Sequence, residues 1–159
     1  MLFDQMNISI MTKEYARQIS LWKYDGAYSF YDHDGNIDEF LDNYHYFSTN
    51  SKGELIGFFC FGNNAQIPTI EENVYDTTFI DIGLGLRPDL CGKNLGLSFL
   101  NAGLDFARDI YQTNHFRLSV AAFNERAIKV YKSANFFIDQ EVTNSYFNNK
   151  FYIMKCIQL

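Results

Sequence analysis

The sequence predicts an α+β fold with a mixed sheet, in a single domain of residues 1–159. This length suits one domain, which buries about two-thirds of its unfolded surface. Short apolar runs typical of strands are interspersed with longer runs of helical spacing. No repeat, low-complexity block or linker interrupts them, and only two prolines occur. The expected order of elements is β-α-α-β-β-β-α-β-α-β-β, which implies an α+β or mixed-sheet fold.

The first third of the chain is expected to form a strand, a helix, a loop and a second helix. Asn7 to Met11 has the pattern of a short strand, and Thr12 is a suitable N-cap for a helix that runs to about Trp22. Tyr24 to Gly35 is rich in turn residues and aromatics, which favours a loop. The residues that then recur at helical spacing are Ile37, Phe40, Leu41 and Tyr44.

A hairpin and a further strand are expected in the middle of the chain. Tyr46 to Thr49 and Glu54 to Gly62 have the pattern of two strands, and the polar turn Asn50 to Gly53 joins them. After a loop around Pro68, Thr78 to Leu86 is expected to form the next strand.

The remaining residues are expected to form two helices and three strands. A helix is expected from about Lys93 to Tyr111, because its apolar residues recur on one face. A strand at Phe116 to Ala122 and a helix at Asn124 to Ala134 follow. Phe136 to Val142 and Phe151 to Ile157 are expected to pair as the last two antiparallel strands.

Charge and composition exclude some classes of function. The formal net charge is −6, whereas proteins that bind nucleic acid in general present a basic face, so we expect no nucleic-acid partner. An acidic surface suits a cationic or amine substrate, although it is also a common means of staying soluble. The 16 Phe and 11 Tyr residues are unusually many, and they fill a core or line a substrate cavity.

The cysteines and the apolar runs indicate in which compartment the protein is expected and whether it is expected to bind a metal. Cys60, Cys91 and Cys156 are widely spaced, and no Cys-x-x-Cys motif or Cys/His cluster has the spacing of a zinc site, so we expect no metal. An odd, unpaired number of cysteines suits a reducing cytosol. The first 14 residues lack the features of a signal peptide, and Leu55 to Phe61 is too short to span a bilayer. We therefore expect a cytoplasmic protein that does not associate with membranes.

A glycine-containing turn lies between the strand that ends at Leu86 and the following helix. A helix N-terminus offers unpaired N–H groups and the positive end of the helix dipole, so it binds phosphate readily. Gly92 and Gly96 allow a ligand to approach the backbone closely, and Lys93 adds a positive charge. Taken alone, such a turn is more often a tight strand-to-helix connection.

The wider segment of about residues 78 to 137 carries a more specific pattern. It reads strand, Leu-Arg-Pro, Gly-Lys-x-x-Gly, helix, strand and Asn-x-x-Ala-x-x-x-Tyr, and it resembles motifs A and B of the GCN5-related N-acetyltransferase (GNAT) superfamily. The resemblance implies a central, mostly antiparallel, splayed sheet of about seven strands flanked by about four helices. Cys91 and Asn94 depart from the family's Gln/Arg-x-x-Gly-x-Gly/Ala loop, and Asn135 stands where Gly is common. Asn tolerates left-handed backbone better than other non-glycine residues do.

The same resemblance implies that the chain binds acetyl-CoA as a cosubstrate. Acetyl-CoA is expected between the strands Asp81 to Leu86 and Leu118 to Ala122, where pantetheine pairs with the first strand. The pyrophosphate is expected over Gly92 to Gly96. Arg87, Lys93, Lys129 and Lys132 put four cations near these elements, although Lys129 and Lys132 can equally be charges on a helix surface. The residues that we expect to bind the cofactor are Leu84, Leu86, Arg87, Gly92, Lys93, Asn94, Leu95, Gly96, Asn124 and Lys132.

Acetyl transfer to an amine requires removal of a proton from the ammonium, stabilisation of the oxyanion and protonation of the leaving thiolate. Tyr131 lies where the family often places a tyrosine acid near the sulfur; the competing interpretation is a core aromatic. Asp81 lies where many members carry a glutamate that acts as the base. It can equally bind the substrate's ammonium or pair with a nearby cation. The three histidines are isolated in sequence and belong to no recognisable triad.

Two classes of function are therefore considered. The first is an N-acetyltransferase in which the amine attacks acetyl-CoA directly in a ternary complex; a small amine is favoured over a peptide N-terminus. The aromatic loop Trp22 to Tyr31, with Asp25, Asp32 and Asp34, lies where the family's variable acceptor site tends to be. The second is a non-catalytic CoA-binding or protein-interaction module of the same fold. A homodimer is possible, because the C-terminal strands can either close one sheet or pair with another subunit.

Overall fold

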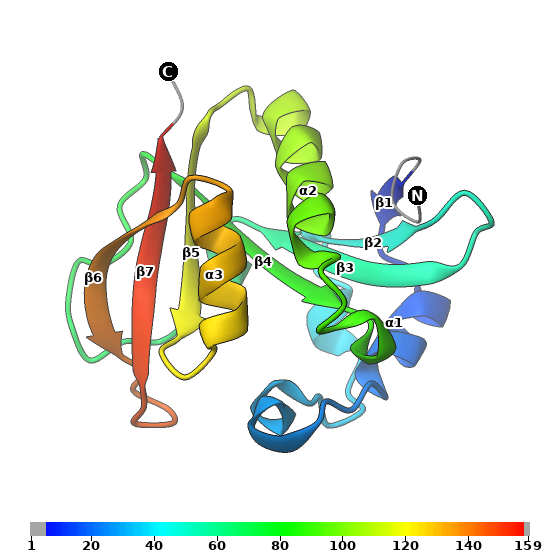
Figure 1. Cartoon of the computed structure of the whole chain (residues 1–159), viewed down its shortest axis with the longest axis horizontal. Coiled ribbons are helices and arrows are strands. Elements are labelled where there is room, and N and C mark those ends of the chain that lie inside the picture. Colours follow the sequence, from blue (N-terminus) through cyan, green and yellow to red (C-terminus); the bar gives the residue numbers. More distant parts are fainter. Residues whose placement is uncertain (1–5, 158–159) are drawn as a thin grey trace. The chain divides into compact units, whose positions relative to one another are not determined.

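The computed structural model of the chain describes residues 6–157. Part of the N-terminal segment on which the expectation of no signal peptide rests therefore lies outside the described residues. The strands are β1 (Asn7–Ile10), β2 (His45–Thr49), β3 (Leu55–Phe61), β4 (Ile80–Leu86), β5 (His115–Ala121), β6 (Phe137–Thr143) and β7 (Lys150–Ile157) (Figure 1). The α-helices are α1 (Lys13–Ser20), α2 (Gly96–Tyr111) and α3 (Glu125–Ser133). Short 3-10 segments occur at Gly26–Tyr31, Asp38–Phe40, Asn63–Ala65 and Pro88–Leu90.

The strands form a mixed sheet in the order β1-β2-β3-β4-β5-β7-β6. β1 with β2, β2 with β3, β5 with β7 and β6 with β7 are antiparallel, whereas β4 and β5 are parallel. The predicted α+β class and the mostly antiparallel sheet are thereby confirmed. None of the helices within the described residues has the length and apolar character that a membrane span requires.

One segment of helical spacing does not form an α-helix. Among the residues from Ile37 to Tyr44, only Asp38–Phe40 are helical, as a 3-10 turn. Short polar side chains hold the neighbouring backbone: Asn36 Oδ1 accepts the N–H of Asp38, and Asp42 Oδ1 accepts the N–H of Tyr44. Such local bonds compete with the helical pattern. Asn43 between them has a φ of 68°, which ends any helix.

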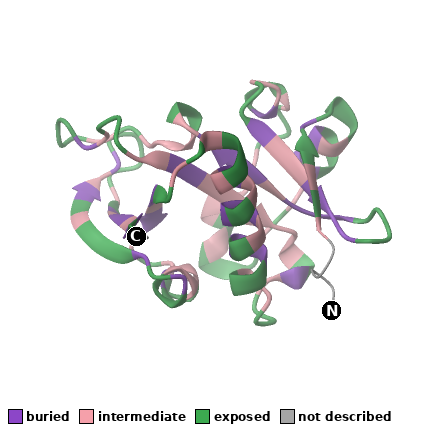
Figure 2. Ribbon diagram, turned by 90° about the horizontal axis from the view of Figure 1, so that it is seen from above, coloured by how far each residue is buried: buried purple, intermediate pink, exposed green. Residues whose placement is uncertain are grey.

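The residues cluster in two compact units, which are described separately. The first contains residues 6–60 and 84–103, and the second contains residues 61–83 and 104–157. The expectation that the chain is one domain stays a prediction. Figure 2 shows which residues of each element are buried.

In the first unit, α1 begins at the expected cap and contributes to the core. Thr12 Oγ1 accepts the N–H of Tyr15 at 3.3 Å. Because the apolar residues of α1 recur on one face, Ala16 and Ile19 are fully buried. The core cluster of this unit is formed by Met11, Ala16, Ile19, Phe40 and Leu55.

Glycine permits a close approach of the helix to the strands of the first unit. The rings of Phe59 and Phe99 stack with their centroids 4.5 Å apart. A Cβ at Gly57 would overlap the ring of Phe99, and one at Gly103 would overlap the ring of Phe59. The absence of side chains at these two glycines therefore sets how closely the elements pack.

In the second unit, β5, β7 and β6 carry most of the core. β5 and β7 pair continuously from His115 opposite Ile157 to Ala121 opposite Phe151. The last two strands, β6 and β7, pair antiparallel from Phe137 opposite Lys155 to Thr143 opposite Lys150, as expected. The parallel pairing of β4 with β5 is short, because only Ile80 with Phe116 and Asp81 with Arg117 are in register. β4 continues through Ile82 and Gly83 without a registered partner in β5.

Candidate functional site

The turn after β4 has a backbone that only a few residue types adopt readily. Pro88–Leu90 form one 3-10 turn, after which Gly92 and Asn94 have φ values of 73° and 60°. Glycine carries no steric penalty there, and asparagine is among the residues that tolerate left-handed backbone. Asn94 thus keeps the turn's shape, as predicted from the sequence.

This turn leaves a run of backbone donors at the start of α2. The first hydrogen bond into the helix runs from the N–H of Phe99 to the carbonyl of Leu95, at 3.1 Å. Within residues 6–157, the N–H groups of residues 92–98 have no hydrogen-bond acceptor. α2 begins at Gly96, three residues later than expected, and continues for 16 residues. The positive end of its dipole and these donors together suit an anion.

Arg87 holds the turn in place. Its Nε and Nη2 donate to the two carboxylate oxygens of Asp89, at 2.6 and 3.0 Å. Its Nη1 donates to the carbonyl of Leu55 at 2.8 Å. The hydrogen bond from Arg87 lowers the pKa of Asp89 and, through the same contact, the pKa of Arg87 is raised. The guanidinium is therefore occupied within the first unit, and its predicted contact with the cofactor stays a prediction.

Lys93 is the exposed cation of the turn. No acidic group within the described residues forms an ion pair with its ammonium, although it lies close enough to contribute to the lowered pKa of Asp89. Its charge is therefore available to a ligand at the donors of residues 92–98.

Tyr24 contacts the end of β4, and no sequence motif predicted this contact. Its hydroxyl donates to the carbonyl of Leu86 at 3.0 Å, and its own N–H is accepted by Asp32 at 2.8 Å. Burial, followed by the charges of Cys91 and Asp32, raises the pKa of the Tyr24 phenol. One of the three acids of the aromatic loop, Asp32, therefore orders that loop.

In the second unit, Asp81 forms a buried ion pair with Arg117. Arg117 Nε and Nη2 donate to the two oxygens of Asp81 at 2.6 and 2.9 Å, and Gln66 Nε2 donates to Oδ2 at 2.9 Å. Asp81 is 3% exposed and Arg117 is fully buried. The guanidinium also lies over the rings of Tyr75 and Phe79. Pairing with a cation, one of the roles considered for Asp81, is the one that the structure displays.

The helix α3 has well-defined ends. Asn124 Oδ1 accepts the N–H of Ala127 at 3.1 Å and caps the N-terminus. At the other end, Asn135 has a φ of 70°, and the N–H of Phe136 donates to the carbonyl of Tyr131 at 3.0 Å. Together with the bond from Asn135 to the carbonyl of Lys132, this is a Schellman motif, so the left-handed residue expected there is confirmed.

Tyr131 lies on α3 at intermediate burial, so it is not a fully enclosed core residue. Its ring centroid is 6.2 Å from that of Phe136. Along the same helix, a shallow hollow of about 520 Å³ is lined by Glu125, Ile128, Lys129, Lys132 and Ser133. The ammonium groups of Lys129 and Lys132 thus border one surface, where they can hold an anionic group.

A model of the acetyltransferase (GNAT) family matches residues 9–136, which is most of the chain. The chain belongs to the GNAT family. No curated protein matches the sequence.

Solved structures with the same fold include two kinds of GNAT acetyltransferase. A spermidine N-acetyltransferase SpeG chimera from Vibrio cholerae and hSSAT is 17% identical, with a TM-score of 0.74 over 97% of this chain and 96% of that one. The aminoglycoside acetyltransferase AAC(6')-Ib in complex with coenzyme A is also 17% identical, with a TM-score of 0.73 over 97% of this chain and 95% of that one. At this identity the likeness concerns the fold, and the splayed, GNAT-like sheet predicted from the sequence is confirmed.

The site residues predicted from the GNAT resemblance are divided between the two compact units. The first unit brings together those of the loop and the end of β4: Leu84, Leu86, Arg87, Gly92, Lys93, Asn94, Leu95 and Gly96. The second unit contains Asp81, Asn124, Tyr131 and Lys132, the last three of them on or at the start of α3. Sequence reasoning missed Arg117, although an arginine within an otherwise apolar strand was a signal that an acid lies opposite it.

Proposed function

We propose that this GNAT protein transfers the acetyl group of acetyl-CoA to the primary amine of a small molecule, by direct attack in a ternary complex. The observation that carries the proposal is the run of unoccupied N–H donors at residues 92–98, at the N-terminus of a long helix. In a GNAT chain, this is the place for the pyrophosphate of the cofactor.

The loop binds the pyrophosphate mainly through its backbone. Phosphate oxygens accept the N–H groups of residues 92–98, and Lys93 supplies the balancing charge. Gly92 and Gly96 leave room for the close approach, whereas the side chain of Asn94 adds atoms where a glycine would have none. Leu84 and Leu86 contribute backbone groups of β4 to the pantetheine, and Leu95, Asn124 and Lys132 complete the proposed contacts.

The reaction consumes an amine and a thioester and yields an amide and a thiol. The neutral amine forms the new C–N bond, the C–S bond breaks, and the departing thiolate takes a proton. We assign that proton to the phenol of Tyr131. The amine releases its own proton to solvent, and solvent then returns a proton to the phenol. N–H groups near Leu84 polarise the thioester carbonyl.

The hydrogen bonds of Asp81 disfavour the general-base role predicted for it. Both of its oxygens accept hydrogen bonds from Arg117, and Gln66 adds a third. A carboxylate whose oxygens already accept three hydrogen bonds has little capacity left to accept a substrate proton. We therefore infer that Asp81 acts as a positioning residue, through Arg117, and that water removes the proton of the ammonium.

A small, cationic amine is the class of acceptor that the chain suits best. Structures of the same fold are named as spermidine and aminoglycoside acetyltransferases. The acidic chain and the loop that carries Asp25 and Asp34 are consistent with a cation, because carboxylates and aromatic faces both attract one. Peptide N-termini form the competing class.

The test combines binding with turnover. Calorimetry with acetyl-CoA should give saturable binding to the wild-type protein, and absence of binding would overturn the proposal. Release of free CoA is then measured with polyamines, aminoglycosides, amino acids and peptides. Tyr131→Phe should lose most of the turnover while still binding acetyl-CoA, whereas Tyr146→Phe, on the exposed hairpin, should match the wild type. Binding without turnover on any amine would favour the non-catalytic module.

A further inference from the structure

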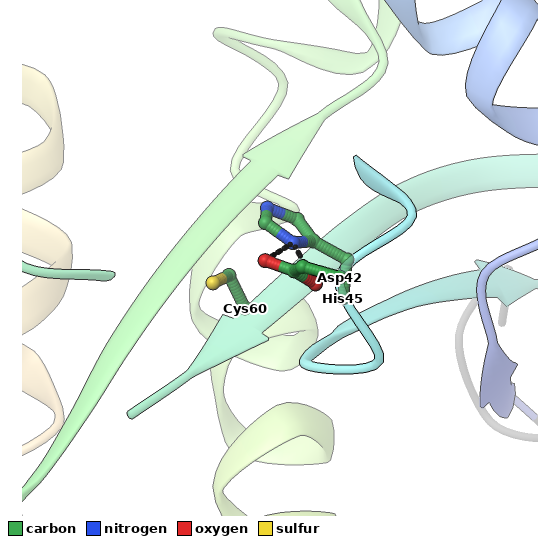
Figure 3. Close-up of side chains that lie close together, drawn as sticks. All are labelled: Asp42, His45 and Cys60. Carbon is green, nitrogen blue, oxygen red and sulfur yellow. Dashed lines mark hydrogen bonds and ion pairs between the residues drawn. The ribbon is translucent and has the colours of Figure 1, made fainter. Parts of the chain in front are cut away.

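Three side chains of different chemistry meet at one end of the β2–β3 hairpin, in the first unit (Figure 3). They are Asp42, His45 and Cys60, and one ligand atom from each lies within 4.8 Å of the others. His45 and Cys60 are direct partners in the antiparallel ladder, so the pleat places their side chains on the same face. Asp42 comes from the turn that leads into β2.

The cluster is held in place before any ligand arrives. Both oxygens of Asp42 lie 2.9 Å from Nδ1 of His45, and Oδ1 also accepts the N–H of Tyr44 at 2.8 Å. The ring of His45 packs edge-on against that of Phe40, with the centroids 5.4 Å apart. Such second contacts fix the orientation of ligands in metal sites.

Burial differs across the cluster in a way that suits the entry of an ion. His45 is 8% exposed and Cys60 is 3% exposed. The side chain of Asp42 is 21% exposed, so the carboxylate forms the side that faces water. An ion can therefore enter past Asp42 and meet the imidazole and the sulfur in a largely dry environment.

We propose that Asp42, His45 and Cys60 bind one divalent transition-metal ion, with Zn²⁺ as the best match. Carboxylate oxygen, imidazole nitrogen and thiolate sulfur are the donors that zinc uses, and three protein ligands leave a fourth, tetrahedral position for water. With Zn–N and Zn–O bonds of about 2.0 Å and Zn–S of about 2.3 Å, the donors of such a site lie about 3.3–3.8 Å apart. The present cluster reaches this spacing through shifts of about 1 Å or less at each side chain.

Binding requires a defined change of protons. The thiol of Cys60 gives its proton to solvent and becomes the thiolate ligand. The Nδ1 proton of His45, which bonds to Asp42 in the free protein, also exchanges with solvent, and the neutral imidazole then carries its proton on Nε2 and presents Nδ1 to the ion. The ion takes the place of the hydrogen bond between His45 and Asp42. The ion therefore replaces that one contact with three metal–ligand bonds.

The buried thiol is not placed for covalent chemistry. Burial and then the charge of Asp42 raise the pKa of Cys60 to about 12, whereas reactive cysteines have a lowered pKa and some exposure. The sequence suggested no metal site because the three donors follow no zinc spacing. The ladder register of β2 and β3 instead brings His45 and Cys60 together, and the turn before β2 adds Asp42.

The test uses the full-length protein, stripped of metal with a chelator and then titrated with Co²⁺ as a spectroscopic substitute for Zn²⁺. One equivalent should produce the ultraviolet charge-transfer band of a cobalt–thiolate bond, and Zn²⁺ should displace it. Cys60→Ser should abolish the band, and Asp42→Asn should weaken the affinity at least about tenfold. Cys156→Ser is the matched control, because Cys156 is also buried but lies in the second unit, and it should leave the band unchanged.

X-ray absorption on the Zn²⁺-loaded wild type identifies the metal ligands without any variant, so the result does not depend on whether the variants fold. One sulfur neighbour at about 2.3 Å, together with nitrogen or oxygen neighbours at about 2.0 Å, is expected. A shell of only nitrogen and oxygen, no binding, or a cobalt–thiolate band that survives in Cys60→Ser would each overturn the proposal. None of these readouts depends on acetyl transfer, so failure here leaves the proposed function untouched.

Discussion

At the scale of single residues, asparagine supplies most of the left-handed backbone that is not glycine. The non-glycine residues with positive φ are Asn43, Asn73, Asn94, Gln112, Asn135 and Asn148, among those that the structure describes. Asparagine adopts this region because its short polar side chain bonds to the local backbone. At Asn94, in the turn that we propose binds the pyrophosphate, the side chain also takes up space that a ligand would otherwise occupy.

Replacing Asn94 by glycine separates backbone shape from side-chain bulk. We expect Asn94→Gly to bind acetyl-CoA severalfold more tightly in calorimetry, because the backbone keeps its φ while the pyrophosphate gains room. The matched control is Asn135→Gly, which has a similar φ but lies at the end of α3. Both variants should change the free energy of unfolding by less than about 1 kcal/mol. Weaker binding by Asn94→Gly would mean that the amide itself contacts the cofactor.

The ion pair between Asp81 and Arg117 gives a second prediction for single residues. Asp81→Asn should lower the free energy of unfolding by about 3 kcal/mol or more, because it leaves a buried guanidinium without its countercharge. Urea denaturation measures this. The control is Asp105→Asn, whose carboxylate is 77% exposed in its pair with Arg108, and it should cost at most about 0.5 kcal/mol.

The same Asp81 variant tests the positioning role in catalysis. If Asp81 acts through Arg117, the pH profile of kcat/KM should keep its shape in Asp81→Asn while its height falls. Loss of the limb that rises with pH, measured under conditions in which circular dichroism shows that the variant is still folded, would instead identify Asp81 as the general base.

At the scale of elements, the helices differ in how the N–H groups at their N-termini are bonded. Thr12 caps α1 and Asn124 caps α3, each through one side-chain oxygen. Within residues 6–157, no side chain caps the start of α2, and the N–H groups of Gly96 to Ser98 have no acceptor. A helix without a capping side chain is the one that a ligand can cap.

Removing the two caps distinguishes a structural asparagine from one that also binds the cofactor. Thr12→Ala and Asn124→Ala should each lower the free energy of unfolding by about 1 kcal/mol in urea denaturation. Only Asn124→Ala should also raise the Kd for acetyl-CoA. Equal affinities in the two variants would restrict Asn124 to its capping role.

The charge at the start of α2 is tested with Lys93→Ala. We expect the Kd for acetyl-CoA to rise about two- to fivefold at low salt, since a charge at an exposed helix end contributes roughly 0.3–1 kcal/mol. The effect should shrink as ionic strength rises, because salt screens exposed charges. Lys52→Ala, in the exposed β2–β3 turn, should leave the Kd unchanged at any salt concentration.

At the scale of the whole molecule, cofactor binding should raise the thermal stability. At a concentration 100 times its Kd, acetyl-CoA should add about 2.7 kcal/mol to the free energy of unfolding, because it binds the folded chain. Differential scanning calorimetry should show a Tm that increases with ligand concentration. Coenzyme A should have nearly the same effect and acetate none, because the proposed anchor is the pyrophosphate. A Tm that responds to neither nucleotide would contradict that anchor.

The sequence by itself determined the order of the strands and of α1, α2 and α3, and the left-handed backbone at Asn94 and Asn135. Apolar periodicity, Thr12, the glycines of the loop and the asparagines at positive φ act over a few residues, so their effects can be predicted locally. The Asn-to-Tyr helix and the loop were therefore placed correctly, and the family followed from them.

Only the tertiary structure decided what the charged and nucleophilic side chains contact. Asp81 meets Arg117 across 36 residues, and Arg87 meets the carbonyl of Leu55 across 32. The side chains of His45 and Cys60 meet because of a ladder register. No local pattern encodes such contacts, because the partner of a side chain depends on which strands pair and in which register. That is why the pairing of Asp81 with Arg117, one of the roles considered for Asp81, is visible only in the tertiary structure.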